Sequence, residues 1–154
     1  MDELTFDAIA PQFLFVRCIG APPESRVAEY FAWMTAQMRT GTGGVLVMDS
    51  RRSMLFSPTF VTQQAKWLRD HQDLIEEKGR GTAIVLGQPV LRFALSSILS
   101  LAPTPTPLTA HDTLFDALDW AMGRLRASGI TVPEPMLEMA RAEAPGRAGP
   151  TKVA

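Results

Sequence analysis

Apolar runs alternate with amphipathic stretches along most of the chain, and the clearest run extends from Val45 to Met48. This run is rich in β-branched residues and follows Gly43 and Gly44. A continuous apolar run of this length is typical of a strand that is buried on both faces of a sheet. Four polar residues, Asp49 to Arg52, come directly after it. The pattern therefore predicts a central strand that ends in a polar loop.

Four further stretches have the character of short strands. Phe13 to Ile19 is apolar almost throughout, whereas Leu4 to Ala10 is more polar and precedes it across Pro11 and Gln12. These two stretches predict an antiparallel pair in which the first strand is an edge. Thr82 to Leu86 and Leu108 to His111 are the other two predicted strands.

Between the strands, apolar residues recur at three- and four-residue spacing, which predicts helices. The predicted helices cover Pro23 to Arg39, Pro58 to Lys78, Pro89 to Ala102, and Asp112 or Thr113 to Ala127. Gly79 or Gly81 is expected to cap the second helix. Strands that alternate with helices in this way pair in parallel through right-handed crossovers. The sequence therefore predicts an α/β fold: a mixed, mostly parallel sheet of four to five strands with an antiparallel edge strand, packed by about four helices.

The periodic pattern ends near Gly129, which suggests a boundary in the chain. Residues 1–129 are expected to form one α/β domain, a size that can bury a hydrophobic core. Residues 130–154 are rich in proline, alanine and glycine. This segment is expected to be a flexible tail, in which Pro135 to Ala142 can form one or two amphipathic turns.

Composition and charge exclude several classes of protein. The 154 residues are 46% hydrophobic and 20% charged, which is ordinary for a globular protein, and the net charge is −1. No global basic field exists to attract nucleic acid. The first residues lack the pattern of a signal peptide. The most apolar helical stretch, Val90 to Ala102, is shorter than the ~20 residues that span a bilayer. We expect a soluble, cytoplasmic protein that binds no nucleic acid and has no integral membrane segment.

Residues with catalytic or metal-binding chemistry are sparse and scattered. Cys18 lies in an apolar run and is interpreted as a core residue. His71 and His111 have no acidic or cysteine companions at ligand spacing. The glycines from Gly41 to Gly44 lack the Lys-Ser/Thr pair of a phosphate-binding loop. Because no nucleophile–base pair or nucleotide motif is found, we expect no catalytic residue, no cofactor and no metal, and therefore no enzyme.

The order of elements from Phe13 to Leu125 resembles the small bacterial STAS-type, SpoIIAA-like proteins and their SEC14-like relatives. The stretches that carry the resemblance are VLVMDSRR and the segment from Gly79 to Leu125. The individual residues are Asp49, Gly81, Arg92, Pro107, Ala117 and Trp120. The resemblance implies a non-enzymatic module that binds protein partners or, in some branches, nucleotides or lipids.

Ser57 is the candidate phosphoacceptor that this resemblance implies. Family members carry an Asp-Ser-Ser-Gly-like motif at the start of the helix after the central strand. Ser57 stands at that place, but Phe56 and Pro58 flank it, so the preceding Asp and the following Gly are missing. Two interpretations stay open. Ser57 either caps the helix that begins at Pro58, or it accepts a phosphate at the positive end of that helix.

The polar loop after the central strand is the candidate site for an anion or a partner. Its residues are Asp49, Ser50, Arg51 and Arg52. In open α/β sheets, ligands bind at the carboxyl ends of strands, and two arginines suit a phosphate or a carboxylate. The alternative is a solvated loop in which Asp49 pairs locally.

The predicted helix of residues 89–102 is apolar at nearly every azimuth, whereas a surface helix needs one apolar stripe. Its surplus apolar residues either lie under the proline-rich segment and the tail, or form an exposed patch for another protein or for a second copy of the chain. The interface candidates are Val90, Leu91, Phe93, Leu95 and Ile98.

Two functional hypotheses follow from these observations. The first is a regulatory or scaffolding module that acts through protein–protein interaction, in signalling, with a homodimer through helix 89–102 as one form of the contact. The alternative is a small-ligand binder that holds a lipid, a nucleotide or another anion between the second and third helices, near Arg51, Arg52 and Arg92.

Overall fold

A computed structural model describes residues 2–54 and 57–145. Its sheet has five strands in the order β1-β2-β3-β4-β5. The strands are β1 (Glu3–Ala10), β2 (Phe13–Gly20), β3 (Gly44–Ser53), β4 (Gly79–Val85) and β5 (Leu108–His111). β1 pairs antiparallel with β2, and the other three pairings are parallel. The predicted mixed sheet with an antiparallel edge strand is therefore confirmed.

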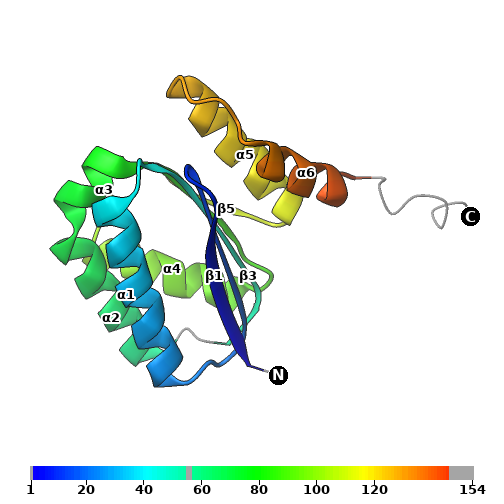
Figure 1. The fold of residues 1–154 in the computed structure, drawn as a ribbon. Coiled ribbons are helices and arrows are strands. Elements are labelled where there is room, and N and C mark those ends of the chain that lie inside the picture. Colours follow the sequence, from blue (N-terminus) through cyan, green and yellow to red (C-terminus); the bar gives the residue numbers. More distant parts are fainter. Residues whose placement is uncertain (1, 55–56, 146–154) are drawn as a thin grey trace, which may run out of the picture.

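Two layers of helices cover the sheet (Figure 1). The helices are α1 (Glu24–Thr40), α2 (Pro58–Asp70), α3 (Gln72–Lys78), α4 (Pro89–Leu101), α5 (Leu114–Ala127) and α6 (Glu134–Glu143). Each parallel crossover moves one strand further in the same direction, so right-handed connections bring α1 to α4 to one face. The opposite face is left to the segment after β5, which folds as α5 and α6.

The segment that the sequence predicted to be a flexible tail contains an ordered helix. α6 packs against α5 and β1, and Met136 in its first turn is fully buried. α5 packs over β3, β4 and β5, so β1 and β2 would stay uncovered on this face without α6. The expected boundary at residue 129 is therefore wrong for residues 134–143, because this short amphipathic stretch completes the second layer. Residues 146–154 lie outside the described residues.

Two helices begin at side-chain caps that the sequence predicts. Ser57 Oγ accepts a hydrogen bond of 3.1 Å from the Phe60 amide, and Thr113 Oγ1 accepts one of 3.1 Å from the Asp116 amide. The long second helix of the prediction is two helices, α2 and α3, which meet at His71. This break and α6 raise the number of helices in the described residues to six, against about four expected. Gly79 caps α3, as predicted.

β3 is longer than the sequence predicted. It continues through Asp49 to Arg52 and ends at Ser53, so the four polar residues lie in a strand and not in a loop. The physical reason is that β2 extends equally far and supplies a partner for them: Arg17 pairs with Asp49, and Ile19 pairs with Arg52.

Candidate functional site

An apolar cavity lies between the sheet and the layer of α1 to α4. Along β3 the side chains alternate between the two faces of the sheet, and their burial differs with the face. Val45 and Val47 face α5 and are 1% and 0% exposed. Leu46 and Met48 face the other layer and are only partly buried, although helices cover them. The helices on this side therefore do not close onto the central strand.

The cavity separates two parts of the core on this face. One cluster of buried residues lies under α1, α2 and α3, and a second lies between β4 and α4. Met48 packs at the margin of both clusters. The space between them has a volume of about 110 Å³ and is partly open to solvent.

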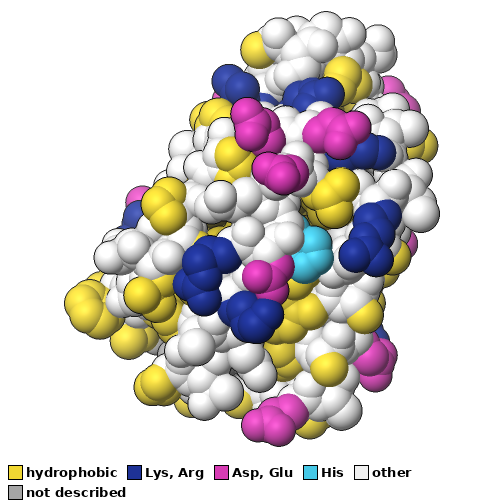
Figure 2. Space-filling model, turned by 90° about the vertical axis from the view of Figure 1, so that its left-hand side faces the viewer, with side chains coloured by type: hydrophobic (Ala, Val, Ile, Leu, Met, Phe, Trp, Pro, Cys, Tyr) yellow, Lys and Arg dark blue, Asp and Glu magenta, His cyan; other side chains and the backbone are white. Residues whose placement is uncertain are grey.

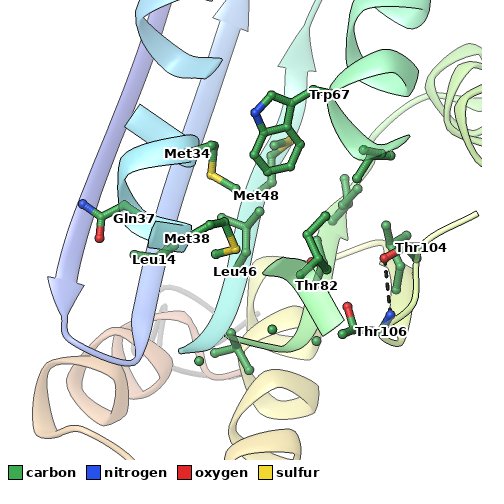
Figure 3. A pocket seen from close by; sticks show the side chains of 18 of the residues that line it. Leu14, Met34, Gln37, Met38, Leu46, Met48, Trp67, Thr82, Thr104 and Thr106 are labelled. Atoms are coloured by element: carbon green, nitrogen blue, oxygen red, sulfur yellow. Dashed lines mark hydrogen bonds between the residues drawn. The ribbon is translucent and has the colours of Figure 1, made fainter. Parts of the chain in front are cut away.

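Flexible and aromatic side chains line the wall of the cavity (Figure 3). Met34 and Met38 come from α1, Met48 from β3 and Trp67 from α2, and they point into the same space. Methionine is unbranched and polarizable, so it adapts to ligands of different shape. The wall is therefore suited to an apolar group of no single fixed shape.

Three threonines lie together on one side of the cavity. Thr82, Thr104 and Thr106 come from β4 and from the segment before β5, whereas Gln37 lies on α1 at the other side of the space and its amide points away from them. These residues lie near the amino ends of the parallel strands, where Gly43 also lines the space. Gly43 has φ +85° and packs on the Lys78 carbonyl, so a side chain does not fit there. A ligand with an apolar body and one polar group matches this distribution.

Trp67 is held in place by a hydrogen bond at its ring edge and by a stacking contact on its ring face. Its Nε1–H donates to Thr35 Oγ1 at 3.0 Å, and its ring stacks on the His71 imidazole at a centroid distance of 4.5 Å. His71 Nδ1 lies 2.7 Å from the Trp67 carbonyl oxygen, where α2 gives way to α3. This network fixes α2 against α1 and makes Trp67 a rigid part of the wall.

α4 divides the five interface candidates of the sequence into two groups. Leu91, Leu95 and Ile98 are 2%, 9% and 3% exposed, so they belong to the interior of the subunit. Leu95 and Ile98 line the cavity. The expectation that these three residues lie on an exposed patch is therefore wrong, because α4 packs an ordinary apolar stripe inward.

Three further apolar residues of α4 face outward. Val90, Phe93 and Leu101 are 62%, 74% and 54% exposed. They lie on the side of the helix next to the buried stripe. Figure 2 shows the face of the molecule that carries α2 and α3, and hydrophobic side chains gather toward its left-hand edge. An exposed apolar patch does exist, but it is smaller than the sequence suggested.

A cluster of charged side chains lies at the carboxyl ends of β2 and β3, on the side of α6. Asp49 is 5% exposed and forms ion pairs with Arg51 at 2.8 Å and with Arg17 at 3.2 Å. Burial acts to raise the pKa of Asp49, but the hydrogen bonds and charges of Arg51, with the charge of Arg17, outweigh it and lower the pKa. The sequence identified Arg51 but not Arg17, because their proximity depends on the register of β2 and β3.

Ser50 points to the opposite face from Asp49. Its Oγ is a buried side-chain atom with no hydrogen-bond partner in the described part of the chain. It borders a void of about 10 Å³, together with Cys18 and Ser53. Cys18 is buried, and Ser53 Oγ donates to its Sγ at 3.2 Å, which supports the prediction of a core cysteine.

The remaining candidate residues lie apart from one another in the described part of the chain. In residues 2–54 and 57–145, no group of three His, Cys, Asp or Glu side chains is placed to hold a metal ion. Arg92, expected near Arg51 and Arg52, instead pairs with Asp112 at 2.6 Å. Over the same part of the chain, none of the helices has the length and apolar character needed to cross a bilayer. Ser57 is exposed and caps α2, whereas Phe56 lies outside the described residues.

No protein-family model matches the sequence, and a search of curated proteins finds no match. Among solved structures, the anti-sigma factor antagonist SpoIIAA in its unphosphorylated form has a TM-score of 0.54 and 14% identity, covering 84% of this chain and 100% of SpoIIAA. An uncharacterized protein of the DUF3478 family from Shewanella loihica, with a SpoIIAA-like fold, has a TM-score of 0.56 and 15% identity, covering 78% of this chain and 93% of its own. At these identities the likeness establishes the fold alone. The chain has a SpoIIAA-like, STAS-type fold, as the sequence resemblance implied.

Proposed function

We propose that this protein is a non-enzymatic binding module that holds a small apolar ligand between its sheet and the layer of α1 to α4. The observation that carries the proposal is the partial exposure of Leu46 and Met48 at the centre of a helix-covered sheet. Protein interiors are normally close-packed, so an apolar space at this position calls for an occupant.

The size of the cavity limits the ligand. An engineered apolar cavity of roughly 150 Å³ binds benzene. The space of about 110 Å³ therefore suits one ring or a short acyl segment, and a longer chain would extend through the open side. Thr82, Thr104 and Thr106 offer hydrogen bonds to a single polar head group.

Thermal unfolding with two uncharged probes, toluene and 1-octanol, tests this proposal. Ligand at one hundred times its dissociation constant stabilises the native state by about 2.7 kcal/mol. Because Trp67 lines the cavity, its fluorescence should change on binding. We expect both signals, with 1-octanol binding more tightly because it supplies a hydroxyl group.

A matched pair of variants separates the cavity from other apolar surfaces. Leu46→Trp places a large ring in the cavity and should abolish binding, whereas Leu101→Trp makes the same change at an exposed position outside it. The proposal fails if neither probe stabilises the protein, or if Leu46→Trp binds as well as the native chain.

The exposed side of α4 supports a second candidate function, contact with a protein partner or with a second copy of the chain. Val90, Phe93 and Leu101 are large apolar side chains that water covers in the isolated subunit. A regulatory role in cytoplasmic signalling would use such a surface. Phe93→Glu should prevent self-association, measured by light scattering, without lowering the unfolding temperature. A native chain that is monomeric at all concentrations would exclude the homodimer.

Control of the module by phosphorylation at Ser57 stays a prediction. The hydroxyl is accessible, and a phosphate would lie at the N-terminus of α2, where the helix dipole favours negative charge. Ser57→Asp should change partner binding if Ser57 acts as a switch, and unchanged binding would reject that role.

A further inference from the structure

The carboxyl ends of β2 and β3 carry a recess on the face opposite the wall of the apolar cavity. Six residues line this recess: Arg17, Cys18, Ile19, Asp49, Arg51 and Arg52. Three of the six are arginines, and only one is acidic. The recess is therefore chemically different from the apolar cavity and independent of the function proposed above.

A β-bulge brings two consecutive arginines to the same recess. In a regular strand, Arg51 and Arg52 would point to opposite faces of the sheet. Here the register between β2 and β3 shifts, so that Arg17 pairs with Asp49 but Ile19 pairs with Arg52. Both arginines consequently line one recess with Arg17. Bulges commonly redirect side chains next to functional sites.

Asp49 orients two of the three guanidinium groups. Arg51 binds it in a bidentate manner, with Nε 2.9 Å from Oδ1 and Nη2 2.8 Å from Oδ2. Arg17 uses only its Nε, 3.2 Å from Oδ2, while its guanidinium lies over the Phe15 ring at 5.2 Å. The two Nη groups of Arg17 therefore have no protein partner among the described residues. The Arg52 side chain is exposed and forms no hydrogen bond or ion pair with the described residues.

The charges of the recess do not balance. Three guanidinium groups and one carboxylate leave an excess of two positive charges, and Asp49 stays ionised at neutral pH because its two arginine partners lower its pKa. A phosphate monoester carries a charge between about −1.5 and −2 at pH 7 and offers several acceptor oxygens, whereas a carboxylate carries −1. Arginines with free N–H groups bind phosphate oxygens with paired hydrogen bonds.

We infer that this recess is a binding site for a phosphate group, in which Arg52 and the free Nη groups of Arg17 bind the ligand and Asp49 holds Arg17 and Arg51 in position. The group is supplied either by free phosphate or by a phosphorylated residue of a protein partner. Glu143 at the end of α6 acts electrostatically on Arg51 and is an acidic group outside the lining that would oppose the ligand.

Isothermal titration of the full chain with inorganic phosphate, a phosphoserine peptide and acetate tests the inference. We expect phosphate to bind and acetate to bind at least ten-fold more weakly. Arg52→Ala removes a charged donor with no structural partner and should weaken phosphate binding roughly ten-fold. Glu143→Gln removes the opposing charge and should strengthen it. Arg39→Ala, at another exposed arginine whose side chain has no partner among the described residues, is the matched control and should change nothing.

Each outcome of this experiment decides one question. Equal affinity for phosphate and the phosphopeptide assigns the site to the phosphate group alone, and tighter binding of the peptide assigns it to a phosphorylated partner. Acetate that binds as well as phosphate, an unchanged Arg52→Ala variant, or an equal loss in Arg39→Ala would overturn the inference. The Arg52→Ala variant should still bind 1-octanol. A failure of the phosphate site therefore does not count against the apolar cavity, and the two proposals are tested separately.

Discussion

The two faces of the sheet differ in how closely their helices pack, although the same strands supply both. On the α5 side, Ala83, Val85, Ala117 and Ala121 are all fully buried, and these small side chains let the helix approach the sheet. On the other side, large rings such as Tyr30 and Trp67 stand between helix and sheet. The distance between packed elements follows the size of the side chains at the contact. One face is therefore a close-packed core, and the other encloses a cavity.

This difference assigns separate tasks to the two layers. Burial of apolar side chains is the dominant favourable term in folding, and a closely packed layer buries them most completely. A cavity forgoes part of that stability, because its lining atoms lack contacts on one side. The layer of α5 and α6 should then carry most of the stability of the fold, and the layer of α1 to α4 should carry the binding of the apolar ligand. The predictions below test this division.

The largest effect should come from removing α6. A chain that ends at Gly129 loses the fully buried Met136 and the nearly buried Ala140 and exposes part of β1 and β2. The lost burial amounts to about 5 kcal/mol, a large part of the stability of an ordinary domain. Chemical denaturation should show a shortened chain that is unfolded or barely stable. If the shortened chain and the full chain have the same unfolding curve, the segment after Gly129 does not stabilise the fold and behaves as a flexible tail.

The same substitution on each face should have unequal effects. Leu118→Ala on α5 opens a void in the close-packed layer and should cost about 3 kcal/mol. Leu46→Ala enlarges a cavity that is already present and should cost about 1 kcal/mol, since Leu46 is not fully removed from water in the native chain. Equal losses in urea unfolding would contradict the contrast between the two layers.

Local patterns in the sequence were sufficient to predict most of the fold. The apolar run of β3, the caps Ser57 and Thr113, and the strand Leu108–His111 all follow from signals within a few residues. α6 was missed because its helix is short and its stability comes from Met136 packing into a core formed far away in the sequence. Short helices depend on such tertiary contacts more than on their own propensity.

The sites depended on long-range geometry and were predicted less well. The surplus of apolar residues in α4 correctly indicated that this helix has apolar contacts beyond one buried stripe. The sequence could not show that Leu95 and Ile98 line a cavity. Asp49, Arg51 and Arg52 were identified as an anion site candidate, yet Arg17 came from another strand, and the bulge that aligns the arginines is a matter of register. Register is set by the whole sheet and by no single run of residues.

A smaller loss of stability should follow from changing Asp49, and this loss should depend on pH. Asp49 lies on the same face of the sheet as the close-packed layer, near the carboxyl end of β3. Its folded-state pKa lies below the unfolded value of about 3.9, so the carboxylate stabilises the fold above that pH. This contribution is lost as the pH falls through the folded-state pKa. Asp49→Asn should therefore cost about 1.5 kcal/mol at pH 7, and the difference from the native chain should shrink between pH 5 and pH 2. A difference that is constant with pH would show that the charge of Asp49 plays no part.

The smallest effect should come from Ser50, a polar side chain on the looser face. Its buried hydroxyl has no partner in the described residues, and an unsatisfied buried group lowers stability. Ser50→Ala should therefore leave the free energy of unfolding unchanged or raise it by up to about 1 kcal/mol. Ser53→Ala is the matched control. Ser53 donates a hydrogen bond to Cys18, so the protein should lose stability when that bond is removed.

If Ser50→Ala is also destabilised, the adjoining void of about 10 Å³ holds a water molecule that satisfies the hydroxyl, since that volume is close to the minimum for one water. That result would mean that part of the looser layer is filled by solvent, and the empty space available to an apolar ligand would then be confined to the region around Leu46 and Met48.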